Sequence, residues 1–398
     1  MARLFKYLTL TLFLPLWYIQ LLFPRKDNIW IFGAWNGQRY SDNSKYLFDY
    51  VSENHKDIMA IWITKDKKVQ SRIREQGKKC YMSNSLKGIY LSLRAKFVIV
   101  SSGKNDISKL FVNGAKLVHL WHGNPLKKIG LDDNYSSANG FFYSKIVRWF
   151  YPMVYEFNYD YMVSNSQIFT PFMQSSYRLN TDQILETGCP RNDIFYSTSK
   201  DVFNIELSKR FKDSKIVYYL PTFRNSETPK NIFTQDDYVE EKVEAFLQKE
   251  NIVLVNKGHF VESKTGLSGT SQNSRIVHLK DSDITSDINN MLKDADALIT
   301  DYSSAFFDFL LTERPILFAA FDLQEYMSHS RELYFNYEDA VAGPIVHNWE
   351  EILFQLSTIW NDEENKKVVL QKNKIYNKYH DAFNSKRVTD ALLRLSNK

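Results

Sequence analysis

Short apolar runs alternate with longer segments of helical periodicity along most of the chain. In the first half, runs typical of strands occur at residues 29–32, 59–63, 97–100, 116–120 and 161–164. In the second half they occur at 216–220, 252–256, 276–279, 297–299 and 315–318. Strands that alternate with helices indicate βαβ units, and therefore parallel, doubly wound sheets.

The two series predict two domains. The charged stretch at 199–214 lies between them, is rich in Lys and Asp, and is interpreted as a linker. We therefore expect an α/β fold with two Rossmann-like domains that face a cleft. The expected parts are an apolar segment at 1–26, a first domain at 27–205 and a second domain at 206–398.

The stretch from Ala295 to Leu311 has the pattern of a strand, a polar turn and a helix. Asp301, Ser303 and Ser304 occupy the turn. A serine pair at the start of a helix places two hydroxyls beside unpaired backbone N–H groups, and in an open parallel sheet this point lies where ligands bind. Phosphate binding is one interpretation, and an ordinary N-cap explains the same residue types.

The first 26 residues differ from the rest. Residues 7–23 carry no charge, and Pro24, Arg25 and Lys26 end the run. Pro15 and several polar residues weaken it as a membrane span, whereas Trp17 and Tyr18 suit the headgroup region of a bilayer. We expect a membrane-surface anchor, with a helix packed on the domain as the alternative.

Composition narrows the functional classes. The chain has 398 residues, 44% of them apolar, with a net charge of +5, which is too mild to indicate nucleic acid by itself. Cys80 and Cys189, its two cysteines, show no disulfide or metal-ligand spacing, so a reducing compartment is expected. Carboxylate pairs at metal-ligand spacing are missing, so no obligatory metal is expected, although Mg²⁺ held by a diphosphate would leave little trace.

Candidate chemistry lies at the ends of the predicted strands. His122 in WHGNPLKK and His259 in NKGHF each follow a strand. A histidine is a plausible general base because its ordinary pKa is near neutrality, although a lone histidine is more often structural. Basic and hydroxyl residues at strand ends in both domains predict a cleft for a phosphorylated ligand.

An ordered series of motifs makes a family resemblance specific. WHGNPLKKIGLD, GCPRND, LPTFR, the segment 287–318 with its DYSS sequence, and YFNYEDAVAGPIV occur in this order. Together they resemble the CDP-glycerol glycerophosphotransferase family, over roughly residues 30–350. The resemblance implies a two-domain GT-B fold and an enzyme that moves glycerol phosphate from CDP-glycerol to a hydroxyl of a lipid-linked acceptor.

The resemblance also implies roles for individual residues. His122 matches the proposed base and His259 a second essential histidine, although Phe260 replaces the usual proline after it. The implied donor-binding residues are Thr222, Arg224, Lys257, Asp301, Ser303 and Ser304. The residues implied on the acceptor side or in support are Ser41, Asn43, Gly123, Lys127 and Arg191.

The expected partners are a CDP-glycerol or CDP-ribitol donor, a lipid-linked saccharide acceptor and the cytoplasmic surface of the cell membrane, with peripheral attachment. Nucleic acid is not expected. The alternative function is a GT-B glycosyltransferase that uses a nucleotide sugar, because the two classes share fold and phosphate site.

Overall fold

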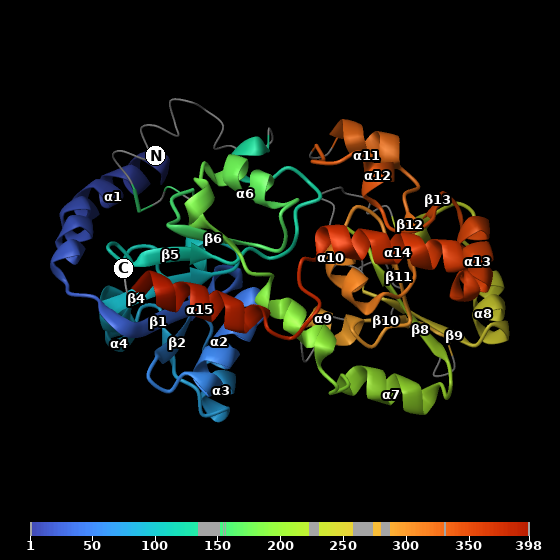
Figure 1. Cartoon of the computed structure of the whole chain (residues 1–398), viewed down its shortest axis with the longest axis horizontal. Helices are drawn as coiled ribbons and strands as arrows, with labels where there is room; N and C mark the ends of the chain where they lie inside the picture. The colour runs from blue at the N-terminus through green and yellow to red at the C-terminus, as the bar shows by residue number, and fades with distance from the viewer. Residues whose placement is uncertain are drawn as a thin grey trace. The chain divides into compact units, whose positions relative to one another are not determined.

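The chain forms two compact units, seen in a computed structural model of the protein (Figure 1). Unit 1 comprises Met1–His122, Lys128–Asp193 and Asp381–Lys398, and unit 2 comprises Gly123–Lys127 and Ile194–His380. The structure describes residues 2–133, 152, 153, 155, 157–222, 231–257, 274–279, 287–329 and 332–396.

Unit 1 is built on a seven-stranded parallel sheet of order β3-β2-β1-β4-β5-β6-β7. Its strands are β1 (Lys26–Gly33), β2 (Met59–Thr64), β3 (Cys80–Met82), β4 (Ala95–Val100), β5 (Lys116–His119), β6 (Tyr161–Ser164) and β7 (Ile184–Glu186). Its helices include α1 (Ala2–Ile19), α2 (Asp42–Asn54), α3 (Lys67–Glu75), α4 (Leu86–Arg94), α6 (Thr170–Tyr177) and α15 (Asn384–Ser396). The central strands read as almost continuous apolar runs because helices cover both faces of the sheet.

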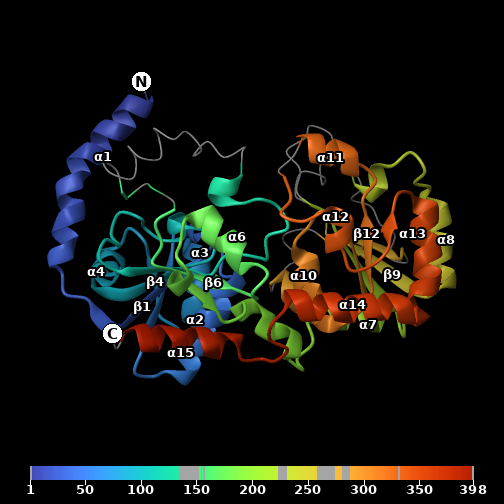
Figure 2. The same ribbon diagram turned by 45° about the horizontal axis from the view of Figure 1, so that its top comes forward.

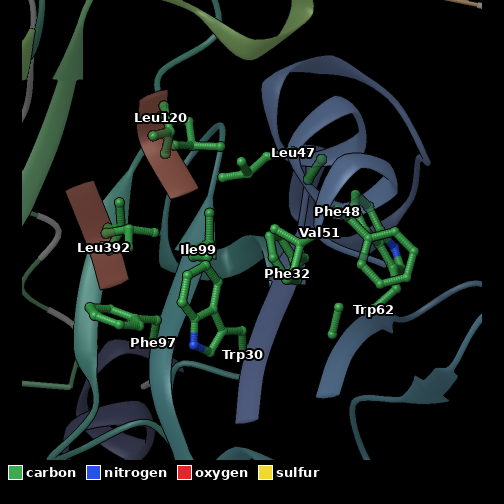
Figure 3. Packing of buried hydrophobic residues seen from close by; sticks show 14 of the residues in the cluster. Trp30, Phe32, Leu47, Phe48, Val51, Trp62, Phe97, Ile99, Leu120 and Leu392 are labelled. Atoms are coloured by element: carbon green, nitrogen blue, oxygen red, sulfur yellow. The ribbon is translucent and has the colours of Figure 1, made fainter. Parts of the chain in front are cut away.

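Aromatic side chains dominate the core on one face of this sheet. Trp30 and Phe32 from β1 and Phe97 from β4 are fully buried, and α2 places Phe48 against Trp62 of β2 with ring centroids 5.5 Å apart (Figure 3). Each large side chain of this kind stabilises the fold by about 1.5–3 kcal/mol when it is fully buried. This packing holds the strand ends, and hence the loops that follow them, in fixed positions.

Unit 2 repeats the design with a six-stranded parallel sheet of order β10-β9-β8-β11-β12-β13. Its strands are β8 (Lys215–Leu220), β9 (Ile252–Asn256), β10 (Ile276–His278), β11 (Ala297–Thr300), β12 (Ile316–Ala319) and β13 (Ile345–Val346). Its helices include α7 (Val202–Arg210), α8 (Glu240–Lys249), α9 (Ile288–Leu292), α10 (Ala305–Phe309), α11 (Leu323–His329), α12 (Tyr337–Ala340), α13 (Trp349–Thr358) and α14 (Glu363–Tyr376).

In both sheets, the direction in which successive strands are added reverses once, at the switch point of the sheet. In unit 1 the chain runs from β1 outward to β3 and then returns to β4 on the other side of β1. In unit 2 it runs from β8 outward to β10 and returns to β11 beside β8. Ligands of open parallel sheets bind beyond the carboxyl ends of the two strands at such a switch point. The loops after β1 and β4, and those after β8 and β11, are therefore the places to examine.

All ten strands expected from the apolar runs are present, but the expected domain boundaries need correction. The segment 199–214 contains α7, which belongs to unit 2: Asn204 donates to the Met291 carbonyl at 2.7 Å and accepts from the Tyr218 hydroxyl at 2.6 Å. It is therefore more than a linker.

The end of the chain, expected in the second domain, belongs to unit 1. Val388 and Leu392 of α15 belong to the core cluster that contains Trp30 of β1 and Phe97 of β4, and Figure 3 shows Leu392 among these side chains. The periodicity of α15 shows that it has an apolar face, but not which sheet that face covers.

Helix α1 runs along one side of unit 1 (Figure 2). Its C-terminal end and the turn that follows are attached to the domain: Asn113 donates to the Trp17 carbonyl at 2.8 Å, and Gln20 donates to the Leu110 carbonyl at 2.7 Å. Its outer face is exposed, with Leu12 at 81% and Leu22 of the following turn at 79%. Within the described part of the chain, no helix has the length and hydropathy of a membrane span.

Candidate active site

The loop after β1 adopts an unusual backbone conformation at the switch point of unit 1. Trp35, Asn36 and Asp42 have φ angles of 48°, 56° and 65°. These left-handed values are uncommon for residues other than glycine and cost about 1–3 kcal/mol each, so surrounding contacts must hold them in place. Gly37, with a φ of 76°, adopts the same region without that cost.

The carboxylate of Asp106 supplies such a contact. It accepts hydrogen bonds from the backbone N–H of Asn36 at 2.8 Å, of Ser101 at 3.0 Å and of Ser102 at 2.7 Å. Asn36 follows β1, whereas both serines follow β4, so one side chain ties together the two loops of the switch point. Burial raises the pKa of Asp106 to about 6, although hydrogen bonds from the backbone oppose this shift.

His122 lies at the same edge of the sheet, three residues after β5. Its Nδ1 is 3.2 Å from the carbonyl oxygen of Ser101. A carbonyl oxygen can only accept a hydrogen bond, so Nδ1 carries the proton in the neutral ring and Nε2 carries the lone pair. The ring lies 4.2 Å from that of Trp121 and 5.6 Å from that of Trp35, measured between centroids. This tautomer is the one that a general base acting through Nε2 requires.

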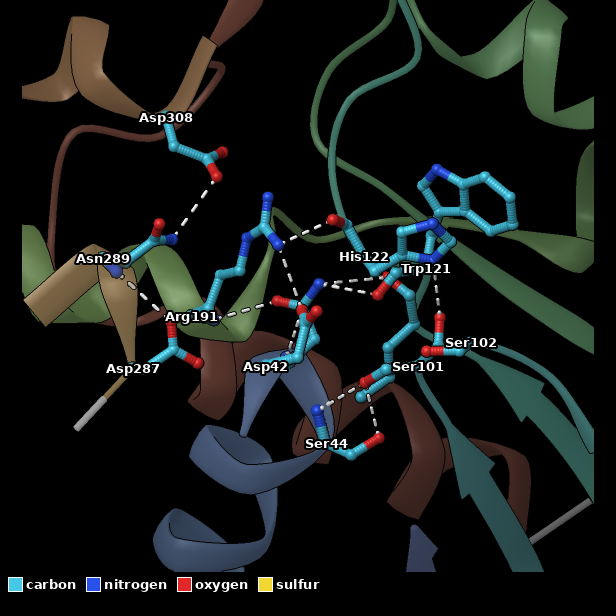
Figure 4. A network of polar contacts seen from close by, with 12 residues as sticks. Asp42, Ser44, Ser101, Ser102, Trp121, His122, Arg191, Asp287, Asn289 and Asp308 are labelled. Carbon is cyan, nitrogen blue, oxygen red and sulfur yellow. Dashed lines mark hydrogen bonds and ion pairs between the residues drawn. The ribbon is translucent and has the colours of Figure 1, made fainter. Parts of the chain in front are cut away.

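A buried polar network fixes the backbone on both sides of His122 (Figure 4). The side chain of Asn43 donates to the Trp121 carbonyl at 2.9 Å and accepts from the backbone N–H of Arg191 at 2.9 Å. The guanidinium of Arg191 donates to the His122 carbonyl at 2.7 Å and to the Asp42 carboxylate at 3.1 Å. Asn43 and Arg191 therefore hold the backbone of Trp121 and His122 in place.

Ser41 begins the helix that carries Asn43. It stands at the N-cap of α2, but its side chain makes no cap bond, and within the described residues its buried hydroxyl has no hydrogen-bond partner. A buried hydroxyl without a partner is costly, which makes Ser41 a candidate contact for a ligand.

The fully buried ring of His119, at the end of β5, is a different case from His122. It stacks on Tyr159 with an interplanar angle of 10° and a centroid distance of 4.5 Å. Burial lowers the pKa of His119 to about 3, with a further lowering from nearby His122. It is therefore a neutral core histidine.

The switch point of unit 2 is organised by Asp301. Its carboxylate accepts from the backbone N–H of Thr222 at 2.8 Å and of Tyr302 at 2.6 Å, and so joins the loops after β8 and β11. Tyr337 donates from its hydroxyl to the Asp301 carbonyl at 3.0 Å. The Thr222 hydroxyl is buried, and within the described residues it has no hydrogen-bond partner.

The predicted serine turn lies directly after Asp301. The helix that follows is shorter than the expected 305–311: α10 ends at Phe309 and a 3₁₀ turn continues it. Ser303 Oγ accepts from the Ala305 N–H at 3.3 Å, whereas within the described residues Ser304 makes no side-chain cap bond. Ser303 thus fits part of the N-cap interpretation, and the Ser304 hydroxyl is not used in capping.

The other predicted residues lie as follows. Lys257 follows β9 and donates its backbone N–H to the Tyr219 carbonyl at 3.0 Å. Gly123 and Lys127 belong to unit 2, where the Lys127 ammonium lies 5.2 Å from the Tyr326 ring centroid. Their expected place in the first domain is therefore corrected. His259 and Arg224 lie outside the described residues.

Four residues of unit 1 were missed from the sequence: Trp35, Asp42, Ser101 and Asp106. The run SSGKND at 101–106, directly after a strand, contained a usable signal because small and acidic residues there often bind backbone groups. Among the described residues, no group of three or more His, Cys, Asp or Glu side chains is placed to hold a metal ion.

Two doubly wound parallel sheets, each with polar residues at its switch point, define an α/β enzyme of the GT-B-like class. The family model for CDP-glycerol:poly(glycerophosphate) glycerophosphotransferase matches residues 16–394, and the chain belongs to this family of transferases.

Its similarity extends to individual relatives. The chain is 30% identical to the teichoic acid glycerol-phosphate transferase of Staphylococcus aureus, over 93% of this chain and 94% of that protein. It is 28% identical to the teichoic acid poly(glycerol phosphate) polymerase of Bacillus subtilis, over 84% of this chain and 44% of that protein.

Among solved structures, the wall teichoic acid polymerase TagF in a variant soaked with CDPG is similar, with a TM-score of 0.74. The two chains are 22% identical, and the match covers 94% of this chain and 90% of that one. At this identity the likeness concerns the fold.

Proposed function

We propose that this enzyme transfers glycerol phosphate, or another polyol phosphate, from a CDP-linked donor to a hydroxyl of a membrane lipid-linked saccharide. The reaction belongs to the synthesis of teichoic acid or a related cell-surface polymer, and CMP is released. Family membership and the teichoic acid relatives support this proposal. The observation that carries it is the geometry of His122, whose Nδ1 faces a backbone carbonyl and whose Nε2 is the basic nitrogen.

In the proposed step, the acceptor hydroxyl attacks the β-phosphorus of the donor. A new bond forms between the acceptor oxygen and that phosphorus, and the bond from phosphorus to the bridging oxygen breaks. The bridging oxygen leaves with the electron pair as part of CMP, and the hydroxyl proton moves to Nε2 of His122. A free hydroxyl has a pKa far above neutrality, so a positioned base contributes about 10²–10⁴-fold to the rate.

Unit 2 is proposed to bind the donor. Thr222 and Ser304 present hydroxyls at the carboxyl edge of its sheet, and Asp301 holds the backbone of both loops. Phosphoryl transfer depends mainly on positioning and on stabilising charge that builds up on the leaving oxygens. Arg224 and His259, which the family resemblance adds, would supply positive charge for the same task. Any Mg²⁺ would be held mainly by the donor diphosphate.

The exposed face of α1 is proposed to attach unit 1 to the cytoplasmic surface of the cell membrane, as a peripheral segment. Leu12, Leu16 and Ile19 are exposed at helical spacing, whereas Trp17 and, in the following turn, Gln20 are buried against the domain. A helix with one docked face and one exposed apolar face suits the headgroup boundary of a bilayer.

The decisive experiment compares donors in the presence of a lipid-linked saccharide acceptor. Purified enzyme is incubated separately with CDP-glycerol, CDP-ribitol and UDP-sugars, and the released nucleotide is identified by chromatography. We expect CMP from one CDP-linked donor, with phosphorus transferred to the lipid fraction. Release of UDP from a nucleotide sugar would instead establish a glycosyltransferase.

A further inference from the structure

Asp106 has a fully buried carboxylate in the first unit, at the end of a short 3₁₀ turn spanning Lys104–Asp106. Neither general acid–base chemistry nor donor binding requires it. Yet the fold makes room for it: a β-carbon at Gly33, the last residue of β1, would lie 2.7 Å from the Asp106 carbonyl oxygen. Only glycine lets this turn approach the strand so closely.

One peptide group connects Asp106 to His122. The N–H of the peptide bond between Ser101 and Ser102 donates to Asp106 Oδ2 at 2.7 Å, and the carbonyl of the same peptide bond faces His122 Nδ1 at 3.2 Å. A peptide group is planar and trans, so its N–H and C=O point in opposite directions and cannot rotate independently. A carboxylate that holds the N–H therefore also sets the direction of the carbonyl.

The charge of the carboxylate adds to this effect. Hydrogen bonds in a chain polarise one another, and a bond to an ionised acceptor is stronger than one between neutral groups. The carbonyl of this peptide is consequently a better acceptor for the Nδ1 proton of His122. The second carboxylate oxygen, Oδ1, holds Asn36 and thereby the adjacent Trp35, whose ring lies beside the imidazole.

We propose that Asp106 is a positioning residue that fixes the Nδ1–H tautomer of His122 through the Ser101–Ser102 peptide, in a chain of carboxylate, peptide and imidazole. The chain leaves Nε2 as the proton acceptor. This inference rests on the proposed function, because it assumes that His122 is the base.

The test uses the variant Asp106→Asn in the full-length chain. An asparagine retains one acceptor oxygen but turns an NH₂ group toward a backbone N–H, so the peptide loses its charged anchor. We expect kcat to fall about 10–100-fold with little change in the KM for the donor, and the alkaline plateau of the pH profile to fall with it. The matched control is Asp66→Asn, because Asp66 also holds two backbone N–H groups, at the start of α3.

A second measurement does not depend on turnover. The chain has eight histidines, and ¹⁵N spectra of histidine-labelled enzyme, assigned by loss of one signal in His122→Ala, report the tautomer directly. Nδ1–H in the wild type and a mixed population in Asp106→Asn are the expected results. Nε2–H in the wild type, or equal kcat in Asp106→Asn and Asp66→Asn, would overturn the inference. Full activity of His122→Ala would instead refute the proposed base.

Discussion

The loops at the two switch points are held together in the same way, although we expect the two sites to have different roles. In each unit an aspartate binds backbone N–H groups from the loops on both sides of the switch point, Asp106 in unit 1 and Asp301 in unit 2. Asp301 directly follows its strand, whereas Asp106 comes six residues after β4 and returns through a turn. Asp106 thereby binds the N–H of the peptide whose carbonyl faces His122.

Backbone strain distinguishes the two switch points further. In the described part of unit 1, four of the five non-glycine residues with left-handed φ angles follow β1 or precede His122 directly: Trp35, Asn36, Asp42 and Trp121; the fifth, Arg178, is the C-cap of α6. In the described part of unit 2, the non-glycine residues with such angles precede strands, at the other edge of the sheet: Asp213, Asn251 and Glu313. Strain that persists beside a reactive group is typical of preorganised catalytic sites. We infer that unit 1 is built for chemistry and unit 2 for binding.

The largest expected effect tests this division directly. Replacing His122 by Ala should lower kcat by about 10²–10⁴-fold, because the acceptor hydroxyl loses its base, while the Kd for CDP-glycerol changes little. Steady-state kinetics and calorimetric titration of the donor measure the two quantities. His55→Ala, at the end of α2, is the control. Near wild-type turnover in His122→Ala would remove this residue from the mechanism.

Membrane binding, proposed for α1, would be a further property of unit 1, the unit with the proposed base. Changing Leu12, Leu16 and Leu22 to Ser should weaken binding to anionic vesicles by about 100-fold, since each exposed leucine contributes roughly 1 kcal/mol or more when it enters the interface. The docking residues Trp17 and Gln20 remain untouched, so the fold should survive.

Vesicle sedimentation measures this binding. Phe354→Ser serves as the control, because it removes an exposed apolar side chain from α13 of unit 2. Equal sedimentation of the triple variant and the wild type would show that the exposed face of α1 does not bind the membrane.

The sequence predicted much of this arrangement, for identifiable reasons. Long buried strands such as β4 and β8 stand out as apolar runs, and their alternation with helices specifies a doubly wound sheet. The three missed strands are β3, β7 and β13, which have only three, three and two residues. Runs this short carry no readable period.

The candidate site was less predictable than the fold. His122 was named from a motif and Asn43 from the family resemblance, but Asp106 acts through backbone groups, and any short acidic turn has the same composition. Left-handed conformations at Trp35 and Trp121 leave no mark in the sequence, because nothing in a tryptophan favours them. Tertiary contacts impose both features.

A third prediction concerns donor binding by unit 2. Changing both Ser303 and Ser304 to Ala should weaken CDP-glycerol binding by about 10-fold or more, because hydrogen bonds to a charged diphosphate are lost. Loss of the Ser303 contact to Ala305 alone should cost only about 1 kcal/mol of stability. Ser85→Ala, which removes a serine N-cap from α4, controls for that cost.

Donor titration and a melting curve separate the two interpretations of this turn. Unchanged affinity with a lowered Tm would make the serine pair a simple cap. The search for the phosphate site would then move to Thr222, Arg224 and His259.

The smallest expected effect is a pH dependence of stability that originates at Asp106. Its pKa is about 6 in the folded chain, raised chiefly by burial from an ordinary value of 3.8. The folded state therefore binds a proton more tightly than the unfolded state, so the contribution of Asp106 to stability is largest below about pH 4 and falls as the pH rises through 6.

Asp106→Asn lacks this titration. The apparent Tm of the wild type minus that of Asp106→Asn should thus decrease by a few degrees between pH 4 and pH 7. His119 contributes the opposite slope, since its lowered pKa makes protonation unfavourable in the folded state, but it is present in both proteins and cancels in the difference. A Tm difference that stays constant or grows toward pH 7 would mean that the three backbone hydrogen bonds outweigh burial, and that the charged form of Asp106 is the stabilising one.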